Sequence, residues 1–373
     1  MDKFSLKDIK KLNYSGVYHY IYQHDLAAKQ AIANDLSMSL PTVTQHLNTL
    51  LEKGLIVQNG SLNSSIGRKA TAYSIVADSK LTIGVEILKQ RLTIVGVDLR
   101  GNTVNVKTRD IPYDNSDSYY QAVSKEILSF IHDLNVREDQ VLGIGFGLQG
   151  LVSQDGEEII YGKVLGCTGI TIRVFKQYLD YPCRFVHDAE CAAICELWDN
   201  PQLQDAMYLS LGYHMGGALI INGAVSNGRT GRTGTIEHMT LVPDGLDCYC
   251  GQKGCVECYC SALSLLTRHK DLESFFQDLQ AQKKTAQNHW RSYLEYLAIT
   301  INNLHMTIDC DIILGGHVAP YLQSTDLDFL HRRIREITAF PEHDTFIFLG
   351  ARKKHAVSIG AALPYIRTYL EQI

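Results

Sequence analysis

Short apolar segments alternate with helical ones from residue 81 to the end of the chain, and this alternation constrains the fold more than any other feature. It is typical of α/β proteins, in which helices cover the faces of a sheet. A body of about 290 residues is long enough for two lobes with a cleft between them. The pattern predicts strands at residues 81–87, 92–99, 141–147, 183–187, 206–211, 217–221, 311–314 and 345–349, and helices at 119–134, 189–198, 288–309 and 357–370.

The composition of the 373 residues indicates a soluble, globular protein. Hydrophobic residues make up 45% of the chain and charged residues 20%, as in ordinary folded domains. No run approaches the roughly 18 apolar residues of a membrane-spanning helix, and the first residues lack the apolar stretch of a secretory signal. We therefore expect a cytoplasmic protein without a membrane segment, whose ten cysteines are reduced.

Residues 1–78 have a different pattern, which predicts a winged helix-turn-helix domain. Apolar and aromatic side chains recur at helical spacing over 12–24, and a second short helix fits 28–36. Ser39 is a good N-cap for a third helix at 40–51. The three-residue break before this helix is typical of a module that places its third helix in the major groove of DNA.

The third predicted helix has one apolar face and one polar face. Val43, Leu47 and Leu50 form the apolar stripe. The opposite face carries uncharged side chains that donate and accept hydrogen bonds, as the reading of base edges requires. We expect DNA contacts from the residues on or beside this face, which are Thr42, Thr44, Gln45, Asn48 and Thr49.

A wing is predicted after this helix. Strand-like residues 55–57 and 72–75 flank a polar loop, and Arg68 and Lys69 at the end of that loop suit a phosphate or minor-groove contact. Residues 1–80 contain nine Lys and Arg against six Asp and Glu, a net charge of +3, while the remainder carries −8. A basic module on an acidic body is compatible with DNA as a partner. The alternative is a three-helix cap with a solvated loop.

Four potential metal ligands lie within eighteen residues of one another: His238, Cys248, Cys250 and Cys255. Glycines at positions 251 and 254 let the backbone turn tightly enough for three thiolates to face one centre. A Cys3His set fills all four positions around a tetrahedral zinc ion, so the predicted site is structural, with one Zn2+ per chain. Cys258 and Cys260 lie close by in sequence, and the alternative is a set of free thiols in a loop.

The metal-ligand stretch and its surroundings resemble the ROK family of repressors and sugar kinases. The resemblance is to the DNA-binding branch of the family, which includes the xylose and N-acetylglucosamine repressors, and it covers nearly the whole chain. It implies an actin-like, sugar-kinase-like body of two lobes. The matching segments are 67–69, 143–147, 187–193, 222–223, the block from His238 through Glu257, and 313–316.

The first difference between this chain and the kinases of the family is in the loops that bind ATP. Kinases of this family open the domain with Asp-x-Gly-Gly-Thr, which binds ATP phosphates, but residues 86–90 here read Glu-Ile-Leu-Lys-Gln. A second phosphate loop, Gly-Thr-Gly-x-Gly in the kinases, reads Gly-Tyr-His-Met-Gly at 212–216. Bulky side chains keep the backbone away from a phosphate. The resemblance therefore implies a body that binds no ATP and is not an enzyme.

The resemblance also implies that the sugar site is partly kept. Family members pair an Asn with the Asp that acts as catalytic base, where this chain has His187 and Asp188. Their sugar-binding Glu is Thr235 here, their zinc-binding His is His238, and the Pro of their Pro-Gly is Gln149. The alternative role for Asp188 is that of a helix N-cap. The candidate effector-binding residues are Gln149, Gly150, His187, Asp188, Thr235 and His238.

These features predict a sequence-specific transcriptional regulator with a winged helix-turn-helix at 1–78 and a two-lobed body at 79–373, whose final helix packs back on the first lobe. We expect a repressor of carbohydrate-utilisation genes, with a double-stranded DNA operator and a sugar or phosphosugar effector bound between the lobes. A homodimer is expected because paired half-sites require two recognition helices. In one alternative the body docks a protein instead of a sugar, and in another the chain is a sugar kinase with an appended module.

Overall fold

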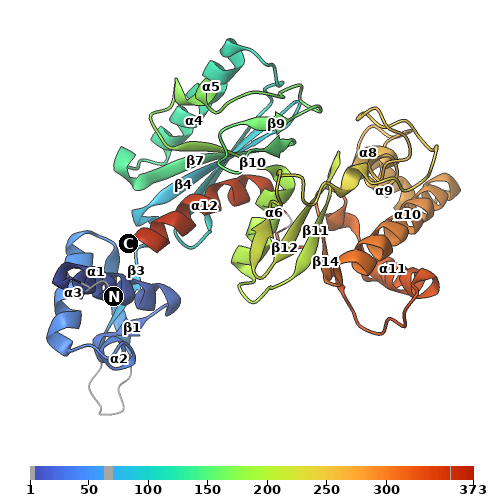
Figure 1. Ribbon diagram of the computed structural model, residues 1–373. Coiled ribbons are helices and arrows are strands. Elements are labelled where there is room, and N and C mark those ends of the chain that lie inside the picture. Colours follow the sequence, from blue (N-terminus) through green and yellow to red (C-terminus); the bar gives the residue numbers. More distant parts are fainter. Residues whose placement is uncertain (1–4, 63–69, 353) are drawn as a thin grey trace.

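The computed structural model describes residues 5–62, 70–352 and 354–373, and it shows a small N-terminal module followed by two lobes (Figure 1). Each lobe contains a five-stranded sheet, and the module contains an antiparallel sheet of order β1-β3-β2. Within the described residues, no helix is long and apolar enough to cross a membrane. The elements of the module are α1 (Leu6–Gln23), β1 (Ala27–Ala28), α2 (Lys29–Asp35), α3 (Leu40–Glu52), β2 (Ile56–Leu62) and β3 (Ala70–Ile75).

The starts of α1 and α3 follow from capping side chains. Ser39 caps α3, because its hydroxyl accepts a hydrogen bond from the backbone N–H of Thr42 at 3.3 Å. α1 begins at Leu6, well before the predicted start at residue 12. Ser5 and Asp8 form a reciprocal capping box there, and residues 8–11 are exposed, so the apolar pattern alone does not reveal this first turn.

The two lobes share one sheet topology, in which three antiparallel strands are extended by two parallel strands. The strand order is β6-β5-β4-β7-β10 in the first lobe and β13-β12-β11-β14-β15 in the second. This repeated arrangement confirms the predicted two-lobed α/β body. The first-lobe elements are β4 (Leu81–Ile87), β5 (Leu92–Asp98), β6 (Thr103–Arg109), α4 (Asp117–Asp133), β7 (Val141–Leu148), β8 (Leu151–Val152), β9 (Ile159–Tyr161), α5 (Arg173–Lys176) and β10 (Cys183–His187).

The second lobe holds its sheet against a set of helices that form the largest apolar cluster (Figure 1). Its elements are α6 (Asp188–Asp199), β11 (Ala206–Leu211), β12 (Met215–Ile221), β13 (Ala224–Ser226), η3 (Ile236–His238), α7 (Glu257–Cys260), α8 (Ala262–Leu265), α9 (Leu272–Gln280), α10 (Lys284–Ile308), β14 (Asp311–Gly315), α11 (Ser324–Ile337) and β15 (Ile347–Leu349). The chain closes with α12 (Ala356–Gln372), which returns to the first lobe and packs on β4, β7 and α6.

Glycines bring α12 unusually close to the backbone of its neighbours. A Cβ on Gly145 of β7 would lie 1.8 Å from the carbonyl oxygen of Ala361, and one on Gly84 of β4 would lie 1.7 Å from that of Ser358. A Cβ on Gly360 of α12 would lie 1.8 Å from the carbonyl oxygen of Cys191 in α6. The helix therefore sits directly against backbone on both sides, with no room for a methyl group.

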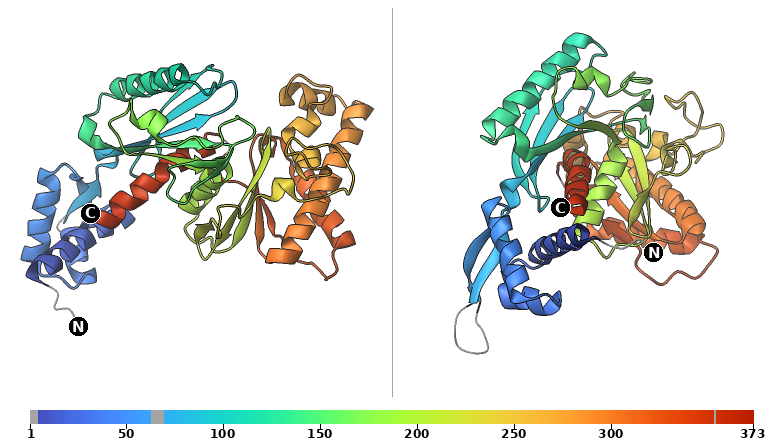
Figure 2. Two further views of the ribbon diagram at one scale, coloured as in Figure 1. Left: turned by 45° about the horizontal axis from the view of Figure 1, so that its top comes forward. Right: turned by 60° about the vertical axis from the view of Figure 1, so that its left-hand side comes forward.

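The N-terminal module docks on the first lobe beside α12, and the C-terminus lies next to the module (Figures 1 and 2). Val17, Tyr18 and Ile21 of α1 belong to the same buried apolar cluster as Val97 and Ile366 of the body. The module and the body are thus joined by continuous apolar packing. The division of the chain after residue 78 stays a prediction, since it concerns folding units rather than contacts.

Polar contacts reinforce this junction. The hydroxyl of Tyr22 donates to the carbonyl oxygen of Leu99 at 2.7 Å, and the Arg100 guanidinium donates to the carbonyl oxygen of Tyr22 at 2.6 Å. The indole N–H of Trp198, at the end of α6, donates to the carbonyl oxygen of Arg100 at 3.0 Å. Arg100 therefore contacts α1 through its side chain and α6 through its backbone.

The close packing of α12 predicts that Gly145→Ala is destabilising. A methyl group there must displace the helix backbone, and overpacking of this kind costs about 1–3 kcal/mol. Thermal unfolding should show a clear fall in Tm. Gly16→Ala, in α1, is the matched control, because a Cβ there meets nothing closer than 3.8 Å. Alanine at a helix interior is favoured by about 0.5–1 kcal/mol over glycine, so the control should match or exceed the wild type. An equal Tm for Gly145→Ala and the wild type would contradict the packing described.

Candidate functional site

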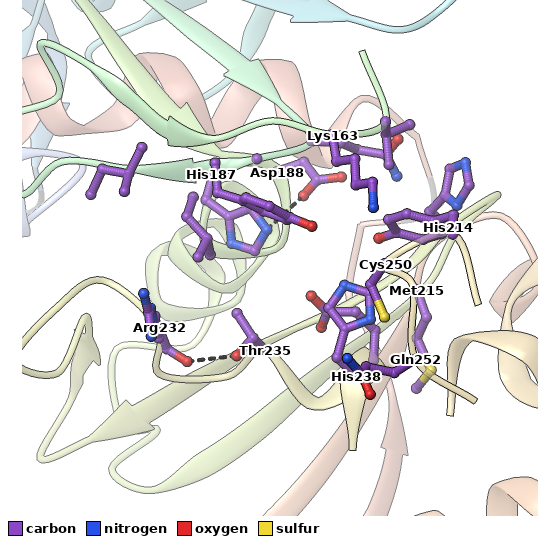
Figure 3. Close-up of a pocket in the computed structure, with 18 residues that line it drawn as sticks. Lys163, His187, Asp188, His214, Met215, Arg232, Thr235, His238, Cys250 and Gln252 are labelled. Carbon is purple, nitrogen blue, oxygen red and sulfur yellow. Dashed lines mark hydrogen bonds and ion pairs between the residues drawn. The ribbon is translucent and has the colours of Figure 1, made fainter. Parts of the chain in front are cut away.

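A cavity of about 410 Å³ lies between the lobes, and all six predicted effector-binding residues line it (Figure 3). They come from ends of elements on both sides. Gln149 and Gly150 follow β7, His187 and Asp188 lie where β10 meets α6, and Thr235 and His238 lie at the η3 turn. Residues that are far apart in sequence are therefore brought to one cavity, as the resemblance implied.

Asp188 is the first residue of α6, and its side chain is mostly buried in the cavity wall. Its Oδ1 accepts the N–H of Ala189 at 2.9 Å and lies 3.2 Å from Nε2 of His187. Burial raises the pKa of Asp188, while the neighbouring His187 ring opposes this shift. The N-cap residue of α6 is His187, not Asp188, and its side chain makes no capping hydrogen bond. Asp188 therefore does not play the N-cap role that the sequence left open.

The cavity also contains side chains that the sequence analysis missed. Glu237 is 8% exposed, and among the described residues its Oε2 atom has no hydrogen-bond partner. Burial raises its pKa to about 8. One feature of the sequence could have indicated Glu237 as a cavity residue, namely its position next to the predicted metal ligand His238. The other cavity residues outside the predicted set include Tyr161, Lys163, His214, Arg232, Tyr249 and Gln252.

Gly234 positions the turn that carries Glu237 and His238. Its φ of +87° is in the left-handed region, and a Cβ there would lie 2.6 Å from the carbonyl oxygen of Gly217 in β12. Ile236, which is buried in the second-lobe core, anchors the same turn. The carboxyl group of Glu237 and the ring of His238 are therefore presented from a backbone pressed against the sheet.

The four predicted metal ligands come together. One ligand atom from each of His238, Cys248, Cys250 and Cys255 lies within 4.8 Å of the others. The Sγ atoms of Cys250 and Cys255 are 3.7 Å apart, and Sγ of Cys248 is 3.7 Å from Nδ1 of His238. Two thiolates at about 2.3 Å from one tetrahedral zinc ion would be separated by about 3.8 Å. The residues therefore fit a tetrahedral metal ion.

The two extra cysteines that the sequence left open point elsewhere. The thiol of Cys258 is directed to the carbonyl oxygens of Leu246 and Asp247 at 3.8 and 3.6 Å. Cys260 is buried, and its Sγ lies 3.7 Å from the hydroxyl of Thr300. Neither belongs to the four-residue group, so the predicted ligand set is the one that the geometry assembles.

The two loops that correspond to phosphate loops have other contacts. The backbone N–H of Met215 donates to Oε2 of Glu257 at 2.7 Å, and Nδ1 of His214 lies 2.7 Å from Oε1 of the same carboxylate. Leu88 and Arg91 close a tight turn through backbone hydrogen bonds. A carboxylate thus already occupies an N–H group of the second loop, where an anion-binding loop presents free donors.

The predicted DNA-reading face of α3 divides into two kinds of residue. Gln45 and Asn48 are exposed, and among the described residues their side-chain amides make no hydrogen bond. The hydroxyls of Thr44 and Thr49 donate to the helix's own carbonyl oxygens, at 2.7 and 3.1 Å. The hydroxyl of Thr42 is paired with that of the N-cap at 2.8 Å. The predicted wing contacts, Arg68 and Lys69, lie outside the described residues.

The chain belongs to the ROK family, whose model matches residues 82–363. Among curated relatives, the DNA-binding transcriptional dual regulator NagC of Escherichia coli (strain K12) is 26% identical over 254 residues, which is 67% of this chain and 62% of that regulator. The chain thus spans less than two thirds of that relative's length. The N-acetyl-D-glucosamine kinase of Escherichia coli O139:H28 is 29% identical over 259 residues, covering 62% of this chain and 82% of the kinase.

Solved structures show the same fold. A ROK family transcriptional regulator, described as a homologue of the E. coli MLC protein, superimposes with a TM-score of 0.75 at 19% identity, covering 98% of this chain and 97% of that one. A ROK glucokinase from Streptomyces griseus, solved with glucose and AMPPNP, has a TM-score of 0.67 at 21% identity and covers 76% of this chain and 98% of the glucokinase. The regulator extends over the N-terminal module, whereas the glucokinase leaves about a quarter of this chain uncovered.

Proposed function

We propose that this chain is a cytoplasmic, sequence-specific transcriptional regulator of carbohydrate genes, controlled by a sugar or phosphosugar in the cavity between its lobes. One observation carries the proposal: a helix with an exposed, uncharged polar face is joined by continuous packing to a sugar-kinase-like body. The similarity of the chain to both a repressor and a sugar kinase is consistent with a regulator whose body has a kinase-like fold. The regulator acts as a homodimer, because two half-sites require two copies of α3.

Helix α6 supplies a route from the cavity to the DNA-binding module. It begins at Asp188 in the cavity wall and ends beside Trp198, whose indole contacts Arg100 at the junction with α1. Its twelve residues span about 18 Å. A ligand that draws the lobes together moves both ends of this helix. To change DNA affinity, the ligand must bind one lobe arrangement better than the other.

In this proposal the protein does not phosphorylate sugars, because the loops that correspond to phosphate loops make other contacts. Glu257 occupies the N–H of Met215, and its negative charge would repel an anionic phosphate there. The ring of Tyr213 lies beside that of His317, with centroids 4.6 Å apart. The alternative, in which the body docks a protein, is disfavoured by the buried carboxyl group of Glu237 in the cavity, whose Oε2 atom has no partner among the described residues, since such a group suits a small polar ligand.

The metal cluster holds one structural zinc ion in this proposal. Three thiolates and one imidazole leave no coordination position for a reactive water. When bound, the ion supplies folding energy to the loop between η3 and α7 rather than chemistry. The same loop contributes Tyr249 and Cys250 to the cavity, so the ion also shapes the effector site.

Metal analysis should find one equivalent of zinc per chain in protein purified without chelator. Cys250→Ser should lower that value and the Tm, because a thiolate ligand is lost. Cys258→Ser is the matched control, since its thiol points to carbonyl oxygens and lies outside the ligand group. Equal zinc contents in the two variants would contradict the ligand assignment.

Gln45→Ala and Asn48→Ala should each relax sequence preference at one base pair. The loss of a base-reading amide costs about 1–3 kcal/mol of discrimination, measured by competition between the operator and single-base variants. Thr44→Val is the control from the same face, because its hydroxyl is engaged with the carbonyl oxygen of Leu40. Unchanged discrimination in both amide variants would refute the DNA-reading role of α3.

Asp188→Asn should weaken the response to sugar and leave operator affinity without sugar nearly intact. The carboxylate accepts hydrogen bonds from sugar hydroxyls more strongly than an amide does. The measurement is operator binding with and without D-glucose, N-acetyl-D-glucosamine and their 6-phosphates. Loss of DNA binding in the absence of any sugar would instead make Asp188 a structural residue.

The purified protein should neither bind ATP nor phosphorylate these sugars. Isothermal titration with ATP and a coupled assay for ADP check both expectations. Sugar-dependent ADP release that scales with protein concentration, and that disappears in Asp188→Asn, would overturn the regulator and favour a kinase.

A further inference from the structure

Glu237 is the buried polar group in the cavity that neither the fold nor the metal cluster explains. It is 8% exposed and lines the cavity, and among the described residues its Oε2 atom has no partner. Glu257, by contrast, has both carboxylate oxygens occupied by His214 and Met215. A buried acceptor without a partner costs roughly 1–3 kcal/mol, so a protein keeps one where something else supplies the donor.

The chain carries this carboxyl group at an unusual place. The resemblance to the family places its sugar-binding Glu at the position of Thr235, two residues before Glu237. The hydroxyl of Thr235 donates to the carbonyl oxygen of Arg232 at 2.8 Å, so its proton is already engaged, and it carries no carboxyl group. The carboxyl group thus enters the cavity from two residues further along the same turn.

We propose that Glu237 is a specificity-determining residue that accepts a hydrogen bond from a hydroxyl or N–H group of the sugar effector. The inference rests on the proposed effector role of the cavity. Asp188 offers a second carboxylate from the opposite side, since Oδ1 is engaged with Ala189 and His187 while no described residue bonds to Oδ2. The cavity therefore presents two carboxyl groups to a ligand, and a carboxyl group in either protonation state can pair with the hydroxyl groups of a polyhydroxy ring.

Two cationic side chains also line the cavity. Lys163 and Arg232 are exposed, whereas Asp188 and Glu237 are not, and Figure 3 shows the two cationic side chains at different sides of the cavity. Both cationic side chains supply positive charge to the cavity in which Glu237 lies, which suits an anionic substituent on the sugar.

The test begins with titration of the wild type by D-glucose, N-acetyl-D-glucosamine and the 6-phosphates of both. The tightest of these is then compared with its monodeoxy analogues, in the wild type, Glu237→Gln and Glu237→Ala. We expect at least a tenfold loss of affinity in Glu237→Ala and a smaller loss in Glu237→Gln, which keeps an acceptor oxygen. One deoxy analogue should bind more weakly than its parent in the wild type but equally well in Glu237→Ala.

Two controls separate recognition from folding. Removing a buried, unpartnered carboxyl group should leave the Tm without sugar unchanged or higher, and the zinc content unchanged. Glu190→Gln is the matched substitution outside this cavity, where the carboxylate is already paired with Asn227 at 2.8 Å, and its sugar affinity should equal that of the wild type. A lower Tm or loss of zinc in both Glu237 variants would make Glu237 a structural residue and overturn the proposal.

The remaining outcomes also test the role of Glu237. If the wild type binds one of these sugars and Glu237→Ala binds it equally well, the role of Glu237 is wrong while the effector cavity stands. If each deoxy analogue binds more weakly than its parent by the same factor in Glu237→Ala as in the wild type, Glu237 does not hydrogen-bond to any of the removed groups. The proposal is then overturned as well. If the wild type binds none of the sugars, both this inference and the proposed function fail.

Discussion

The direct backbone contact of α12 with its neighbours is the constraint on which the rest of the structure depends. Gly84 and Gly145 open the face of the first sheet, and Gly360 lets the same helix lie against α6. Since protein interiors are close-packed, such an arrangement transmits displacement instead of absorbing it. The first sheet, α6 and the docked module therefore move as packed neighbours, and the cavity at the start of α6 is mechanically joined to α1.

The second lobe reaches the cavity through a long loop rather than through a packed helix. The loop from η3 to α7 carries His238 and Cys250, which belong both to the metal cluster and to the cavity wall. Loops of this kind have little apolar surface to bury, so metal ligation is the means of giving them one shape. The effector cavity thus has one wall fixed by helix packing and the other fixed by the ligand cluster.

Much of this arrangement could be predicted from the sequence where local patterns are strong. The strands β4, β10 and β11 were predicted to the residue, because each is a short apolar run with a clear end. The strand β6 was missed because it is a sheet edge with mostly exposed, polar side chains, and α11 was missed because its surface is highly charged. The metal ligands followed from spacing, but Glu237 did not, since only the folded cavity shows that its carboxyl group is buried and unpartnered.

The most direct measurement of the coupling between cavity and DNA is the affinity for sugar with and without a saturating operator duplex, under otherwise identical conditions. Coupling through α6 predicts that the operator weakens sugar binding by the same factor by which the sugar weakens operator binding, because linkage between two sites is reciprocal. Coupling energies of this kind are about 1–3 kcal/mol, or roughly 5- to 150-fold. A sugar affinity that is the same for the free protein and for its operator complex would contradict the coupling.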